Sequence, residues 1–140
     1  MEEKRSTGGG QMTLEEYIRD KKARNSFEKN APFDVYLYRL MNQHGFEKNS
    51  DLYERANVSK QSFSDMVSGK KRPSLNTLLK FVFALRLSNR ECKYLLKKQD
   101  YTLPSSSKSA LVVRYCLDYG IYDLWKINEL LRKENCEQIE

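Results

Sequence analysis

The chain has 140 residues, with 39% hydrophobic residues and a formal net charge of +6. This length allows one domain with an appendage and is enough to bury a core. No apolar run is long enough to span a membrane and no signal-peptide hydrophobic region opens the chain, so we expect a cytoplasmic protein with no membrane partner.

Residues 1–31 are predicted to form an amino-terminal arm. Residues 1–12 are polar and glycine-rich, and we expect them to be disordered. Thr13 and Glu16 have the spacing of a capping box, which predicts a helix over residues 13–28. Pro32 then breaks the chain. The arm is therefore expected to be mostly flexible, with one helix.

Residues 49–74 form the most informative stretch. Asn49 and its polar neighbours offer amino-terminal caps for a short helix, and Ser59 can cap a second helix over residues 59–68. Gly69 suits the left-handed position after that helix, and a basic loop ends at Pro73. This order is typical of a helix-turn-helix, which presents its second helix to the major groove of double-stranded DNA.

Further helical patterns lie on both sides of this motif. A helix is expected over 33–44, a very apolar one over 75–87 and another over 89–98. After a linker-like break at 101–107, helices are expected over 110–119 and 124–133, with Leu111, Tyr115 and Tyr119 forming one stripe of the former. No strand-length alternation is present, so the fold class is predicted to be all-α.

The positive charge is concentrated around the motif. Residues 32–103 carry 13 Lys and Arg against 7 Asp and Glu, which gives +6, whereas residues 1–31 give +1 and residues 104–140 give −1. Neutralisation of phosphates supplies most non-specific affinity for DNA. The placement of charge therefore supports DNA binding by residues 32–103.

The reactive side chains offer little for catalysis or metal binding. Cys92, Cys116 and Cys136 are widely spaced, and His44 is the only histidine. Cys92 and Cys116 are expected to be buried free thiols. No metal cluster, nucleophile–base pair or glycine-rich phosphate loop is recognisable. We predict no metal, no cofactor and no enzymatic activity.

The segment LYERANVSKQSFSDMVSGKKRPSLNTLLKFVFAL resembles the xenobiotic-response-element class of helix-turn-helix regulators, which have the phage repressor and Cro fold. The similarity is carried by Val58-Ser59, Ser68-Gly69-Lys70, Arg72-Pro73-Ser74 and Leu75-x-x-Leu78-Leu79. The resemblance covers roughly residues 33–87 as a five-helix core region, and the helix-turn-helix DNA-binding domain is expected to span residues 32–103. Residues 91–130 are similar to a helical extension of some bacterial members, and a two-helix carboxy-terminal extension is expected over residues 104–140.

The resemblance also implies roles for individual residues. Base contacts correspond to positions at the start of the second motif helix and one turn later: Lys60, Gln61, Ser64 and Asp65.

Phosphate contacts correspond to the start of the first motif helix and to the basic loop: Asn49, Ser50, Lys70, Lys71 and Arg72.

Four residues stand out against the family pattern. Tyr53 stands where alanine is usual, with the small Ala56 three residues on, and Asn57 replaces the usual turn glycine. Asp65 places an anion opposite a polyanionic groove, which either serves to read cytosine or signals that DNA binding is lost.

The leading hypothesis is a sequence-specific transcriptional regulator that binds DNA as a dimer, because one short helix gives limited specificity. The carboxy-terminal helices are candidates for the homodimer interface, or they pack back onto the core. The alternative hypothesis is a protein-binding adaptor, of the antirepressor or phage-defence type, that reuses the same fold without binding DNA.

Overall fold

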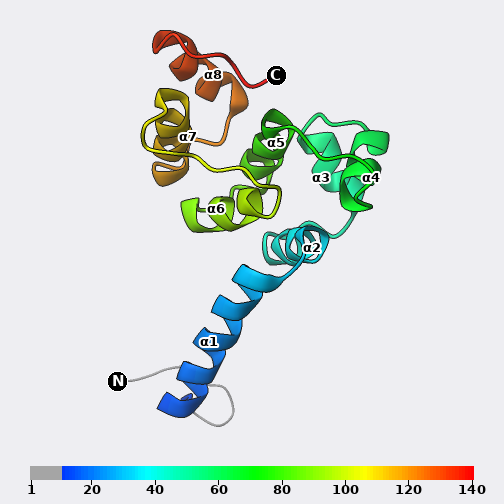
Figure 1. Ribbon diagram of the computed structural model, residues 1–140, viewed down its shortest axis with the longest axis vertical. Helices are drawn as coiled ribbons and strands as arrows, with labels where there is room; N and C mark the ends of the chain where they lie inside the picture. Colours follow the sequence, from blue (N-terminus) through cyan, green and yellow to red (C-terminus); the bar gives the residue numbers. More distant parts are fainter. Residues whose placement is uncertain (1–10) are drawn as a thin grey trace. The chain divides into compact units, whose positions relative to one another are not determined.

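The computed structural model describes residues 11–140, and this part of the chain is helical without strands (Figure 1). The prediction of an all-α fold is confirmed. The chain divides into two compact units after Ala31. The helices are α1 (Leu14–Asn30), α2 (Phe33–Gln43), α3 (Asn49–Arg55), α4 (Lys60–Val67), α5 (Leu75–Leu85), α6 (Asn89–Lys97), α7 (Lys108–Asp118) and α8 (Leu124–Lys133).

The first unit contains α1, which confirms the helix predicted over residues 13–28 and extends it to Asn30. The Glu16 amide donates to Thr13 Oγ1 at 3.1 Å, and the Thr13 amide donates to Glu16 Oε1 at 2.9 Å. This is the reciprocal capping box that the spacing predicted. No residue of α1 is buried. The disorder expected for residues 1–12 falls almost entirely outside the described residues.

In the second unit, α5 supplies much of the core. Six of its residues are buried, and α5 packs against α3 and α6. The expected end of this helix at Leu87 is wrong, because Arg86 is left-handed, with φ of 58°. The Leu87 amide then donates back to the Val82 carbonyl at 3.1 Å, and the Leu87 side chain is fully buried. This apolar closure after a left-handed residue is a common way to end a helix.

The extension packs α7 against α6 and α8 (Figure 1). Ser107 caps α7, so this helix begins two residues earlier than expected. Its buried residues are Ala110, Val113, Cys116 and Leu117. The apolar stripe predicted at Leu111, Tyr115 and Tyr119 therefore lies on the exposed side of α7.

The carboxy-terminal residues are fastened to α8. The Ile139 amide donates to Asn128 Oδ1 at 2.7 Å, and Asn128 Nδ2 donates to the Ile139 carbonyl at 2.9 Å. The Ile139 side chain is buried. Cys92 and Cys116 are buried free thiols, as predicted.

Candidate nucleic-acid interface

The turn between α3 and α4 is built on one left-handed residue. Asn57 has φ of 58°, and the Val58 amide donates to the Tyr53 carbonyl at 2.8 Å. Ser59 then caps α4 by accepting a hydrogen bond from the Ser62 amide at 3.0 Å. Asparagine is among the few side chains that adopt this conformation at low cost, which explains how the turn forms without glycine.

Aromatic side chains pack between α3, α4 and α5. The Phe63 ring is buried, with its centroid 5.6 Å from that of Tyr53 on α3 and 5.8 Å from that of Phe81 on α5. Leu52 and Met66 are also buried. Tyr53 thus fills space between the two motif helices, while Ala56 is buried at the end of α3.

The predicted base-contact residues share the outer side of α4. At 100° per residue, they span roughly 140° of the helix, opposite the side that carries Phe63 and Met66. Three of the four side chains are exposed and Asp65 is half-buried; the four are Lys60, Gln61, Ser64 and Asp65. The fold therefore presents all of them on one surface.

Two of these residues are bonded to each other. Gln61 Nε2 donates to Asp65 Oδ1 at 2.8 Å. The i,i+4 spacing places such side chains side by side on a helix, but the spacing alone does not fix their orientation. The Asp65 carboxylate consequently has a partner within α4.

The first motif helix, α3, begins at Asn49, before the positions at which its caps were expected to end. Lys48 is the residue before α3, and the Lys48 amide donates to Asp51 Oδ2 at 3.2 Å. The expectation that Asn49 or Ser50 caps this helix is wrong, because both lie inside its first turn. Asn49 is exposed there and Ser50 is half-buried.

The basic loop leaves α4 through Gly69, which has φ of 80°. The Lys71 amide donates to the Asp65 carbonyl at 3.1 Å, which folds the loop back against the end of α4. The side chains of Lys70 and Lys71 are exposed.

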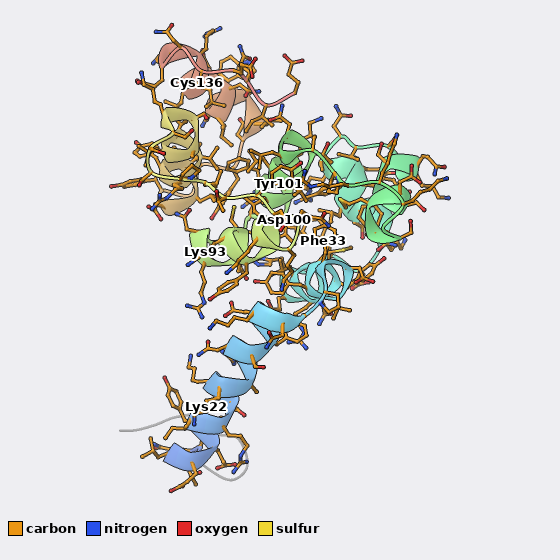
Figure 2. The ribbon with its side chains drawn as sticks, in the orientation of Figure 1. Lys22, Phe33, Lys93, Asp100, Tyr101 and Cys136 are labelled. Carbon is orange, nitrogen blue, oxygen red and sulfur yellow. The ribbon has the colours of Figure 1, made fainter. Side chains whose placement is uncertain are left out.

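Arg72 is engaged by a different part of the chain. Its Nε and Nη2 donate to the Gln99 carbonyl at 3.0 and 2.7 Å, and its guanidinium lies 4.1 Å from the centroid of the Tyr101 ring. Tyr101, labelled in Figure 2, also donates its hydroxyl to the Pro73 carbonyl at 2.9 Å. Residues 101–107 were expected to form a linker, and this contact was not predicted. No hydrophobic periodicity in the sequence indicates it.

Residues 37–89, which run from α2 through the motif to the start of α6, match the profile of the Cro/C1-type HTH DNA-binding domain. This segment is a Cro/C1-type helix-turn-helix domain. The resemblance inferred from the sequence is thereby confirmed, and the match supports a DNA-binding regulator in general terms. Comparison with curated proteins and with solved structures gave no significant match.

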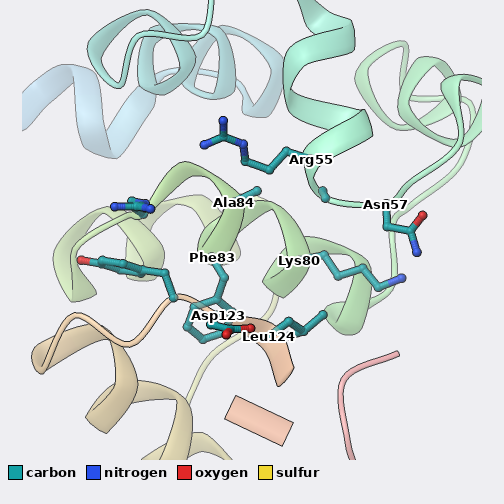
Figure 3. A pocket seen from close by; sticks show the side chains of 10 residues that line it. Arg55, Asn57, Lys80, Phe83, Ala84, Asp123 and Leu124 are labelled. Atoms are coloured by element: carbon teal, nitrogen blue, oxygen red, sulfur yellow. The ribbon is translucent and has the colours of Figure 1, made fainter. Parts of the chain in front are cut away.

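A small cavity lies behind the motif turn, between the Cro/C1-type domain and the extension (Figure 3). It measures about 270 Å³ and is lined by Arg55, Asn57, Lys80 and Asp123, among others. In Figure 3 the Arg55 side chain points away from that of Lys80, so their charges do not converge on one point. Within residues 11–140, no helix is long and apolar enough to cross a membrane, and no group of side chains could hold a metal ion.

Proposed function

We propose that this chain is a sequence-specific transcriptional regulator that places α4 in the major groove of double-stranded DNA. The observation that carries the proposal is a Cro/C1-type domain whose α4 exposes a polar surface opposite its packed side. Lysine can bond guanine O6 and N7, and glutamine can bond adenine. Lys60 and Gln61, in the first turn of α4, are the principal base-contact residues, and Ser64 lies one turn later.

Phosphate contacts are assigned to the two ends of the motif. Lys70 and Lys71 are exposed on the loop after α4, and Asn49 and Ser50 lie in the first turn of α3. Arg72 belongs to the same loop, where its bonds to Gln99 favour a role in holding the loop in position. Its contact with phosphate stays a prediction.

The regulator is proposed to bind as a homodimer through α7 and α8. Leu111 and Tyr115 on α7 are 45% and 48% exposed, Tyr119 directly after α7 is 72% exposed, and Trp125 on α8 is 70% exposed. The Tyr115 and Tyr119 rings are in contact, with their centroids 4.8 Å apart and their planes tilted by 40°. Aromatic residues are enriched at protein interfaces, and residues 104–140 carry a net charge of only −1, so two copies would not repel one another strongly.

Anisotropy of fluorescent duplex DNA, titrated with the full chain at several salt concentrations, tests the proposal. Each neutralised phosphate contributes about −0.9 to the slope of log K against log salt, so a steep negative slope is expected. Absence of binding even at low salt would refute the regulator and favour the adaptor function, with the exposed aromatic side chains of the extension as the partner surface.

A further inference from the structure

We propose that Asp65 fixes the orientation of the Gln61 amide and thereby makes Gln61 a reader of adenine in preference to guanine. This inference rests on the proposed function, because it concerns how α4 reads a base pair. It gives Asp65 a role that requires neither direct cytosine contact nor loss of DNA binding.

The chemistry of the pair permits only one orientation. A carboxylate accepts hydrogen bonds and cannot donate them, so the atom of Gln61 that faces it is Nε2. Gln61 Nε2 lies 2.8 Å from Asp65 Oδ1. With one N–H committed to Asp65, Gln61 keeps one N–H donor and the Oε1 acceptor.

The remaining N–H donor and Oε1 acceptor of Gln61 are complementary to adenine and not to guanine. Adenine presents the N7 acceptor and the N6 donor in the major groove, whereas guanine presents two acceptors, N7 and O6. A freely rotating glutamine can turn both N–H groups of Nε2 toward guanine. Gln61 bonded to Asp65 cannot do so without breaking the contact.

The backbone at Asp65 is held by two further hydrogen bonds. The Asp65 carbonyl accepts hydrogen bonds from the Lys71 amide at 3.1 Å and from Ser68 Oγ at 3.3 Å. Among the described residues, no Lys or Arg forms an ion pair with the Asp65 carboxylate. The carboxylate is therefore directed at Gln61 and not drawn toward the basic loop.

The test compares Asp65→Asn with the wild type on four duplexes that differ only at one base pair. That base pair is the one at which Gln61→Ala abolishes the preference of a selected site. Asparagine has the size of aspartate, but its amide can donate to Gln61 Oε1 and release two N–H groups for guanine. Loss of the negative charge raises affinity for all four duplexes alike and cancels in the ratio.

The wild type is expected to prefer adenine over guanine by about 5- to 150-fold, the range of one bidentate contact. Asp65→Asn and Asp65→Ala are expected to reduce this ratio several-fold. In a protein that already carries Gln61→Ala, adding either Asp65 substitution should leave the adenine-to-guanine ratio unchanged. Alanine favours helix, so Asp65→Ala should retain α4, and circular dichroism checks this.

An unchanged adenine-to-guanine ratio in both Asp65 variants would overturn the inference while leaving DNA binding intact. A preference for cytosine at another base pair would also overturn the inference if that preference depends on Asp65 and persists in Gln61→Ala. That outcome would mean that Asp65 reads cytosine directly. Failure of the wild type to bind any duplex would instead refute the proposed function, and the inference with it.

Discussion

The Arg72 guanidinium stacks on the ring of Tyr101, 4.1 Å from its centroid, although the two residues are 29 positions apart in the chain. The Gln99 carbonyl accepts two hydrogen bonds from the same guanidinium, and the Tyr101 hydroxyl donates to the Pro73 carbonyl. The loop that follows α4 is thus joined to the segment between α6 and α7. The contact connects the predicted phosphate-binding loop to the segment that precedes the extension.

Replacement of Arg72 by alanine should therefore lower stability as well as DNA affinity. Loss of the stacking and of hydrogen bonds from a charged donor is expected to cost about 1 kcal/mol of unfolding free energy, since the site is exposed. Urea denaturation measures this cost. Tyr101→Phe keeps the stacked ring but loses the bond to Pro73, and it should cost less. A stability of Arg72→Ala equal to that of the wild type would mean that the contact is not formed in solution.

Lys70 and Lys71 should affect binding without affecting stability. Both side chains are exposed, and the double variant Lys70→Ala/Lys71→Ala is expected to make the log–log salt slope of DNA binding shallower by about 1.8. The matched control is Lys93→Ala/Lys97→Ala, which removes two exposed charges from α6; Figure 2 labels Lys93. An equal change of slope in both double variants would indicate a general charge effect and not a phosphate site on the loop.

The buried thiol of Cys92 predicts a loss of stability in alkaline solution. Burial raises the pKa of this thiol from 9.0 to about 12. The unfolded chain releases the proton at lower pH than the folded chain does, so the stabilisation is complete below pH 9 and is lost progressively between pH 9 and about 12. Between pH 8 and pH 10.5 the wild type should lose at most about 2 kcal/mol more than Cys92→Ala does, measured by urea denaturation. Equal losses in the two proteins would contradict a buried Cys92.

The exposed stripe of α7 should control the oligomeric state. Leu111→Glu combined with Tyr115→Glu places two carboxylates in the proposed interface and is expected to halve the mass measured by analytical ultracentrifugation. Affinity for a palindromic site should fall at the same time. Tyr38→Glu on α2, where the side chain is 41% exposed, is the matched control and should leave the mass unchanged. A wild type that sediments as a monomer on and off DNA would exclude the dimer.

The sequence predicted the helices well because their signals are local. Caps such as Thr13 with Glu16, Ser59 and Ser74, together with the apolar run of α5, act within a few residues of each other. The errors also have local causes: the left-handed Arg86 ended α5 early, and α3 began before its expected cap. The contact of Arg72 with Gln99 and Tyr101 could not be predicted, because it joins two segments that are far apart in the sequence and depends on the tertiary packing.

For the candidate site, the residue types were predictable and their interactions were not. The family pattern located Gln61 and Asp65 on α4, but the hydrogen bond between them depends on side-chain orientation as well as spacing. Likewise, the spacing of Leu111, Tyr115 and Tyr119 identified a stripe without fixing which side of α7 faces the core. The packing of α7 against α6 and α8 decides that question.

The most direct test of the central claim is the selectivity of a Lys60→Ala/Gln61→Ala double variant. Its affinity for a site selected with the wild type is compared with its affinity for a shuffled duplex at one salt concentration. The wild type is expected to prefer the selected site. The variant is expected to bind both duplexes with similar, weaker affinity, because phosphate contacts remain while base contacts are lost. Undiminished preference in the folded variant would contradict base reading by α4.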